Sequence, residues 1–169
     1  MLNRQESTES SHHLARDKPA LYTYLFKELV ALLARERDFL ANTANCAALL
    51  FESLPDINWA GFYFQKGDDL VLGPFQGKPA CVRIGPGKGV CGAAAMRRET
   101  IVVPNVHEFP GHIACDAASN SEVVVPLIAG GKLIGVLDVD SPLVGRFDQQ
   151  DAVGLERFVA ALLAASDRP

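Results

Sequence analysis

The sequence predicts one α/β (α+β) domain, in which N- and C-terminal helices cover one face of a central antiparallel sheet of about six strands. The chain has 169 residues, a length that suits one domain with a sizeable core. Its apolar residues follow a helical period near both ends and form short β-prone runs between them. This order is typical of a layer of helices packed on a sheet, with loops that can bind a ligand on the other face.

Three helices are predicted from apolar periodicity and their start and stop signals. In the first, over 19–36, leucines recur at helical spacing after Asp17, a typical start signal. The second, over 38–54, ends before Pro55. The closing helix, over 148–166, begins at an aspartate, which is a favoured N-cap residue.

The six predicted strands are short runs rich in β-branched and aromatic residues: 57–65, 70–75, 81–84, 100–103, 121–128 and 132–140. Gly130 and Gly131 indicate a hairpin between the last two. A short helix is expected around Ala93–Ala95. Residues 105–120 form a long connection without periodicity, and such connections are often functional.

Composition and charge exclude several classes of protein. The net charge of −4 provides no basic surface for nucleic acid. No apolar run is long enough to cross a membrane, and residues 1–16 lack the apolar core of a secretory signal. We therefore expect a cytoplasmic protein with a disordered lead-in over 1–16 and a single domain over 17–169.

The four cysteines fall into two groups. Cys46 lies on the apolar stripe of the second predicted helix, which favours core packing. Cys81, Cys91 and Cys115 lie at a strand start, a glycine-rich turn and a long loop. Cys91 is expected near a helix N-terminus, where the helix dipole favours the thiolate. Spacing alone leaves redox thiols and unrelated thiols both open.

A metal site is not expected from these spacings. Structural zinc sites favour cysteine pairs two or three residues apart, whereas the three loop cysteines are separated by 10 and 24 residues. His107 and His112 could add nitrogen ligands, but both are more simply interpreted as ordinary loop residues.

Five segments together resemble the free methionine-(R)-sulfoxide reductases, a GAF-domain family: NWAGFYF (58–64), GPFQGKPACVRIGPGKGVCG (73–92), PNVHEFPGHIACD (104–116), SEVVVPL (121–127) and GVLDVDSP (135–142). The resemblance covers about residues 19–165. It implies a GAF-type domain that reduces the free amino acid without a cofactor. It also implies thioredoxin as the reductant and preference for the R epimer, and family members commonly form homodimers.

By this resemblance, Cys115 is the nucleophile, Cys81 is the resolving thiol and Cys91 is a second candidate for that role. The implied binding residues for free methionine sulfoxide are two aromatic and three acidic side chains: Trp59, Tyr63, Glu122, Asp138 and Asp140. Glu122 is also the expected acid, because a sulfoxide accepts a thiolate only after its oxygen is protonated or strongly hydrogen-bonded.

Strand register provides a check on the acidic residues. Asp138 and Asp140 are two apart on a strand, so both side chains share one face, where they could bind an ammonium group. A regular two-residue turn at Gly130-Gly131 would place Glu122 opposite Val139, on the wrong face. The acid role therefore predicts a β-bulge or an odd-length loop in this hairpin.

Two other functions are consistent with the same residues. A GAF sensory module would bind a small ligand and signal by a conformational change, without turnover. A thiol-based metal-binding regulator is the third interpretation, and the cysteine spacing favours it least.

Overall fold

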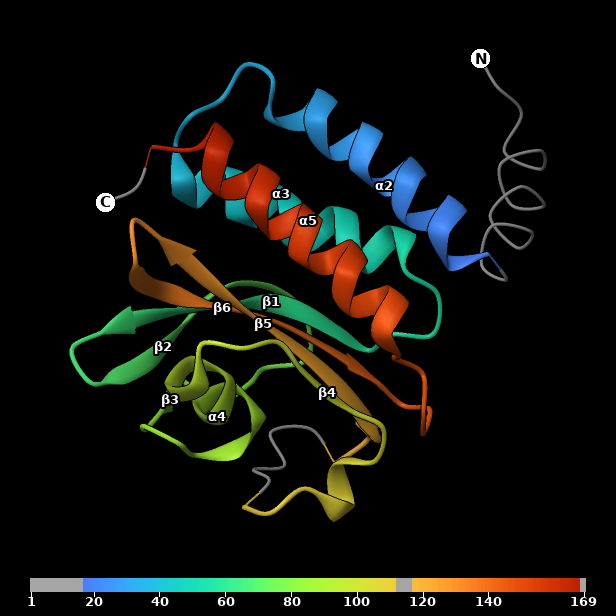
Figure 1. The fold of residues 1–169 in the computed structure, drawn as a ribbon, viewed down its shortest axis with the longest axis vertical. Helices are drawn as coiled ribbons and strands as arrows, with labels where there is room; N and C mark the ends of the chain where they lie inside the picture. Colours follow the sequence, from blue (N-terminus) through green and yellow to red (C-terminus); the bar gives the residue numbers. More distant parts are fainter. Residues whose placement is uncertain (1–16, 112–116, 168–169) are drawn as a thin grey trace.

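The computed structural model describes residues 17–111 and 117–167. Its centre is a six-stranded sheet in the order β3-β2-β1-β6-β5-β4, with every neighbouring pair antiparallel (Figure 1). The strands are β1 (Trp59–Lys66), β2 (Asp69–Gly77), β3 (Arg83–Ile84), β4 (Ile101–Val103), β5 (Ser121–Ala129) and β6 (Lys132–Ser141). The predicted number and arrangement of the strands are confirmed.

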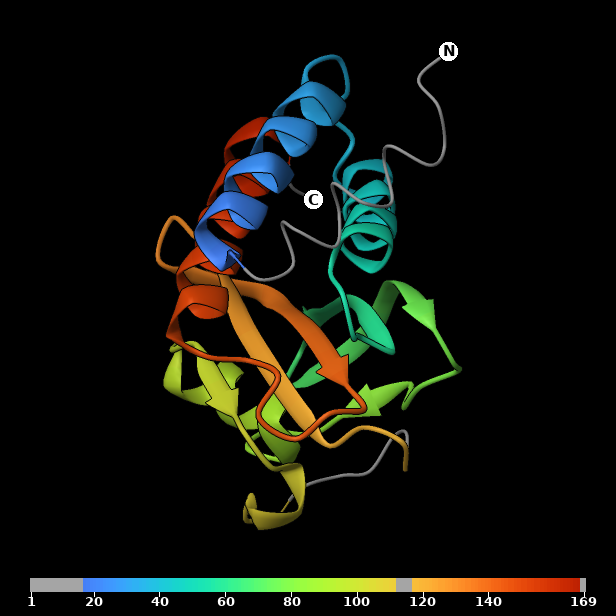
Figure 2. The same ribbon diagram turned by 90° about the vertical axis from the view of Figure 1, so that its right-hand side faces the viewer.

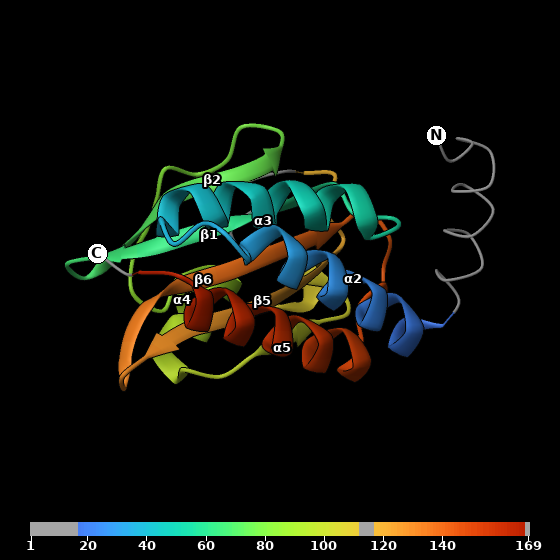
Figure 3. The same ribbon diagram turned by 90° about the horizontal axis from the view of Figure 1, so that it is seen from above.

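Three helices cover one face of this sheet: α2 (Lys18–Leu33), α3 (Phe39–Ser53) and α5 (Gln149–Ala165). Helix α3 lies over β1 and β2, α5 lies over β5, and α2 packs on the outside of both helices (Figures 1 and 3). Asp17, Asp38 and Asp148 cap the helix N-termini by accepting backbone N–H groups. Asp17 and Asp148 are start signals predicted from the sequence, whereas the cap formed by Asp38 was not predicted.

The main core lies between the helices and the sheet. Alternation along the strands directs one set of side chains into it, including Phe62 of β1, Val123 of β5 and Leu137 of β6. Cys46 of α3 is fully buried in this core, as its position on the apolar stripe predicts.

The helical layer is joined by an ion cluster around Asp151 of α5, which is fully buried. Its carboxylate accepts hydrogen bonds from Lys18 Nζ of α2 at 2.5 Å, Arg146 Nη1 at 3.1 Å and the Tyr22 hydroxyl at 3.0 Å. Since Lys18 and Tyr22 belong to α2, the cluster holds α2 on α5.

The other face of the sheet carries helix α4 (Gly89–Arg97) and the 3₁₀ helix η1 (Val106–Glu108) (Figure 2). Here the alternate strand residues form a second, smaller core with α4 that includes Trp59, Tyr63 and Val136. Terminal helices and connecting segments thus lie on opposite faces, as predicted.

Two predicted segments fall wholly or partly outside the described residues. These are the lead-in over 1–16 and the part of the 105–120 connection between 112 and 116. Among the described residues, no helix is both long and apolar enough to cross a membrane.

Candidate active site

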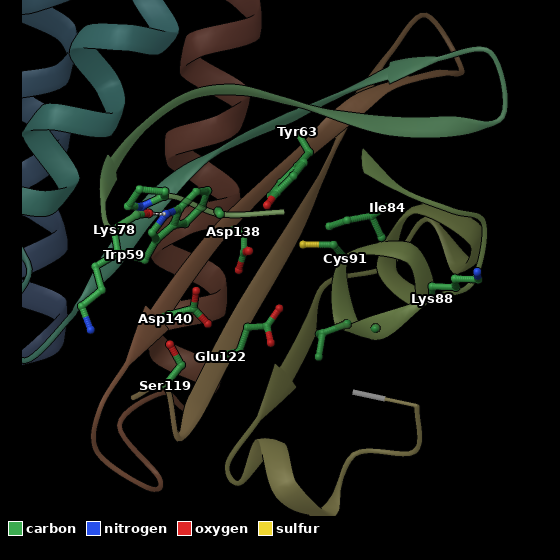
Figure 4. Close-up of a pocket in the computed structure, with 14 residues that line it drawn as sticks. Trp59, Tyr63, Lys78, Ile84, Lys88, Cys91, Ser119, Glu122, Asp138 and Asp140 are labelled. Atoms are coloured by element: carbon green, nitrogen blue, oxygen red, sulfur yellow. Dashed lines mark hydrogen bonds between the residues drawn. The ribbon is translucent and has the colours of Figure 1, made fainter. Parts of the chain in front are cut away.

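A pocket opens on the α4 face of the sheet, between strands β1, β5 and β6 and the segment that leads into α4 (Figure 4). Its walls come from segments far apart in the sequence. The lining residues are Trp59, Tyr63, Lys78, Pro79, Ala80, Ile84, Lys88, Gly89, Val90, Cys91, Ser119, Glu122, Asp138 and Asp140. All five predicted substrate-binding residues are in this set, together with Cys91.

One wall of the pocket is aromatic. Trp59 and Tyr63 are four residues apart on β1 and both face α4, and their rings stack with centroids 5.9 Å apart. The Trp59 ring also stacks on Phe75 at 5.3 Å, and its Nε1 donates to the Lys78 carbonyl oxygen at 3.1 Å. Gly61 leaves room for this ring, because a Cβ atom there would lie 2.6 Å from the indole. The indole is therefore held in place by two ring contacts and one hydrogen bond.

The opposite wall is acidic. Glu122 of β5 pairs directly with Asp140 of β6, and Val124 pairs with Asp138, so the three carboxyl groups share the α4 face. The chain turns at Gly130-Gly131, with Ala129 paired to Lys132. The register then shifts between Ile128 and Leu127, and this shift brings Glu122 opposite Asp140 instead of Val139. This irregularity is the predicted β-bulge. It confirms that Glu122 lies on the same face as the two aspartates.

Burial and mutual repulsion change the proton affinity of these acids. Glu122 is 6% exposed and Asp138 is 7% exposed. Burial first, and then the charges of Asp138 and Asp140, raise the pKa of Glu122 well above its ordinary range. Burial also raises the pKa of Asp138, while hydrogen bonds from Cys91 and Glu122 oppose that shift. The acidic wall can therefore hold a proton near neutral pH.

Cys91 is in the first turn of α4, and its sulfur points toward Asp138 across the pocket (Figure 4). The position at the helix N-terminus is as predicted, but the expected thiolate is wrong. The side chain is buried, and desolvation followed by the charges of Asp138 and Glu122 raises the pKa of the thiol well above its ordinary value. The neighbouring carboxyl groups and burial outweigh the helix dipole.

The remaining cysteines have different environments. Cys46 is a free thiol whose burial raises its pKa to about 12, which suits a packing role. Cys91 is also a free thiol, whereas Cys81, which is half-buried before β3, is disulfide-bonded. Cys115 and His112 lie outside the described residues. His107 forms a hydrogen bond with Asn120 at 2.9 Å, consistent with a loop role.

The sequence did not identify the part of the pocket that comes from residues 78–90. Lys78, Ala80 and Ile84 line it from the connection between β2 and α4, and Lys88 lines it at the N-cap of α4. One signal in the sequence could have identified these lining residues: they lie within a few positions of Cys81 and Cys91. Ser119 completes the pocket and accepts a hydrogen bond from Asn58 at 3.1 Å.

The chain is matched by the model of the GAF domain family over residues 27–166. It is 54% identical over 154 residues to the free methionine-R-sulfoxide reductase of Escherichia coli K12, covering 89% of this chain and 93% of that one.

The solved structures similar to it include two bacterial proteins. One is fRMsr of Staphylococcus aureus in its reduced form, with 50% identity and a TM-score of 0.83, covering 85% of this chain and 94% of that one. The other is the free methionine-R-sulfoxide reductase of Neisseria meningitidis in complex with its substrate. It has 44% identity and a TM-score of 0.84, covering 86% of this chain and 88% of that one.

Proposed function

This chain belongs to the free methionine-R-sulfoxide reductases of the GAF-domain family, and on that premise we propose that it reduces free L-methionine (R)-sulfoxide to methionine. The observation that carries the proposal is the pocket itself. A stacked aromatic wall faces a buried acidic wall, a combination that fits a molecule with an apolar thioether end and a cationic amino end.

Each end of the substrate has a matching set of side chains. The methyl and sulfur groups lie against Trp59 and Tyr63, which present flat apolar surfaces inside the pocket. The ammonium group lies against Asp138 and Asp140, where a positive charge relieves the repulsion between carboxylates. A methionine sulfoxide within a polypeptide has no ammonium group, so this pairing favours the free amino acid.

The first chemical step is the reduction of the sulfoxide by a cysteine thiolate. Glu122 donates its proton to the sulfoxide oxygen, and the Cys115 thiolate attacks the sulfoxide sulfur. The sulfur–oxygen bond of the substrate breaks, the oxygen is transferred as a hydroxyl group to the Cys115 sulfur, and methionine leaves, so Cys115 becomes a sulfenic acid. The raised pKa of Glu122 supports its role as the proton donor.

The second step closes a disulfide. A neighbouring thiol attacks the sulfenic acid, a sulfur–sulfur bond forms and water leaves. We assign this role to Cys81, with Cys115 as its partner. The disulfide-bonded state of Cys81 and the free, buried thiol of Cys91 support this choice over Cys91.

An external dithiol must then reduce the disulfide, and we propose thioredoxin as this reductant, without a cofactor. This requirement favours a reducing compartment, and hence the cytoplasm. We further propose that residues 17–169 act as one domain and that the chain forms a homodimer, which the mass of the purified protein in solution would test.

Turnover assays separate this enzyme from a GAF sensory module. The reduced protein is incubated with a thioredoxin system and one of three substrates: the free R epimer, the free S epimer or the N-acetylated R epimer. We expect methionine formation and reductant consumption with the free R epimer alone. Ligand binding without turnover, unchanged by Cys115→Ser, would establish the sensory function instead.

A further inference from the structure

Three potential metal ligands converge on the floor of the pocket. Cys91 comes from α4, Glu122 from β5 and Asp138 from β6, and one ligand atom from each lies within 4.8 Å of the other two. Figure 4 shows the three side chains pointing toward a common centre. In a tetrahedral zinc site with one sulfur and two oxygen ligands, these atoms are about 3.4–3.6 Å apart, as the metal–ligand bond lengths dictate. Small side-chain rotations would therefore close the site.

A second observation indicates that this cluster lacks a ligand. Asp138 is 7% exposed, and although its carboxyl group accepts hydrogen bonds from Cys91 and Glu122, its Oδ1 atom is buried without a partner among the described residues. A buried carboxylate oxygen without a partner is costly, and most such atoms in folded proteins are hydrogen-bonded. The pocket provides the space through which a small cation can reach this atom.

We propose that Cys91, Glu122 and Asp138 bind a divalent cation of the zinc class, and that this cation blocks the substrate pocket. Binding displaces the protons that these side chains hold, giving three protein ligands and an open fourth position for water. No electron is transferred. The three negative charges then face two positive ones, which removes much of the repulsion within the acidic wall.

The ligand set indicates the kind of cation. One thiolate and two carboxylate oxygens suit a borderline-soft ion such as Zn²⁺, Co²⁺ or Cd²⁺. Mg²⁺ and Ca²⁺ prefer sites made only of oxygen atoms, usually with more ligands than this cluster provides. We therefore expect millimolar Mg²⁺ to leave the site free.

The inhibitory part of this inference rests on the proposed function, because it requires methionine sulfoxide to use the same acidic wall. A metal ion on Glu122 and Asp138 would remove the proton donor and one ammonium partner. Metal and substrate would then compete, and the reductase would lose activity when free zinc rises.

Cadmium titration of the full-length protein in its disulfide form tests the site directly. In this form Cys81 is not a thiol and Cys46 and Cys91 are free, so a count of two thiols per chain is expected before the titration. We expect one equivalent of Cd²⁺ to produce thiolate-to-metal charge-transfer absorption in the ultraviolet. Cys91→Ser should abolish the band, and Asp138→Asn should weaken binding at least about tenfold.

Cys46→Ala is the matched control, since it removes the other free thiol from the opposite side of the sheet. It should leave the band unchanged, and thermal unfolding should show that both cysteine variants are folded. A band that persists in Cys91→Ser, disappears in Cys46→Ala or never forms in the wild-type protein would overturn the inference.

Competition completes the test. Free methionine sulfoxide should raise the apparent Kd for Cd²⁺, and an unchanged Kd would overturn the inhibitory role. The two proposals fail separately. Turnover without a charge-transfer band would support the reductase function and contradict the metal site. A band without turnover would support the metal site and contradict the reductase function.

Discussion

Replacing Glu122 by glutamine removes a proton donor while it keeps the size of the side chain. Glu122 is 6% exposed, and Asp138 and Asp140 add to the rise in its pKa. The wild-type side chain can therefore deliver a proton near neutral pH, whereas an amide cannot. General acid catalysis typically contributes 10²–10⁴-fold, so the rate of methionine formation should fall by about 10²–10⁴-fold, or roughly 3–5 kcal/mol in the activation free energy.

The same substitution should not destabilise the fold. An acid whose pKa is raised on folding opposes folding as pH rises through its unfolded value, and the neutral amide removes that penalty. We expect an unchanged or higher free energy of unfolding at pH 7. The rate is measured in a single turnover, so that the external reductant cannot limit it. Glu156→Gln, on the exposed side of α5, is the matched control.

A rate for Glu122→Gln within threefold of the wild-type rate would refute the acid role. Asp140→Asn helps to separate catalysis from binding. Asp140 is half-buried at the acidic wall, and we assign it to the ammonium group. Its loss should therefore raise KM more than it lowers the single-turnover rate at saturating substrate.

Two further predictions concern the scaffold. Asp151→Ala removes the fully buried carboxylate that binds Lys18 and Arg146, and it leaves Lys18 only its ion pair with the exposed Asp148. Chemical denaturation should show a loss of about 3–5 kcal/mol, whereas a loss below about 1 kcal/mol would contradict a structural role for the cluster. Gly135→Ala places a Cβ atom against the backbone of Tyr63, so it should cost about 1–3 kcal/mol and raise KM by displacing the aromatic wall. Unchanged stability and KM would show that β1 and β6 can separate without disturbing the pocket.

The fold could be predicted well because local and global signals agree. Aspartates at the helix starts, apolar runs in the strands and the double glycine of the last hairpin each indicate one structure. Even the bulge between Leu127 and Ile128 could be predicted, since Glu122 reaches the acidic face only if the register shifts. The prediction follows from two conditions: the acid role requires Glu122 to share a face with Asp138 and Asp140, and side chains alternate between the faces of a strand.

The electrostatic state of the site could not be predicted in the same way. The helix dipole at Cys91 is a local property that can be read from the sequence, but the burial of the thiol depends on β5 and β6 packing against α4. The link between Lys18 and Asp151 joins residues 133 positions apart, and no periodicity indicates it. The pocket wall at Lys78 and Ile84 likewise results from how the 78–90 segment folds over the sheet.

The central claim is that this pocket carries out one thiol-dependent reduction per cycle, and stoichiometry tests it most directly. Fully reduced protein is mixed with excess free methionine-R-sulfoxide and no external reductant, and methionine, free thiols and disulfide-linked peptides are measured. We predict one methionine formed and two thiols lost per chain, with Cys81 linked to Cys115 and Cys91 still free. Bound sulfoxide with no methionine and an unchanged thiol count would contradict the account.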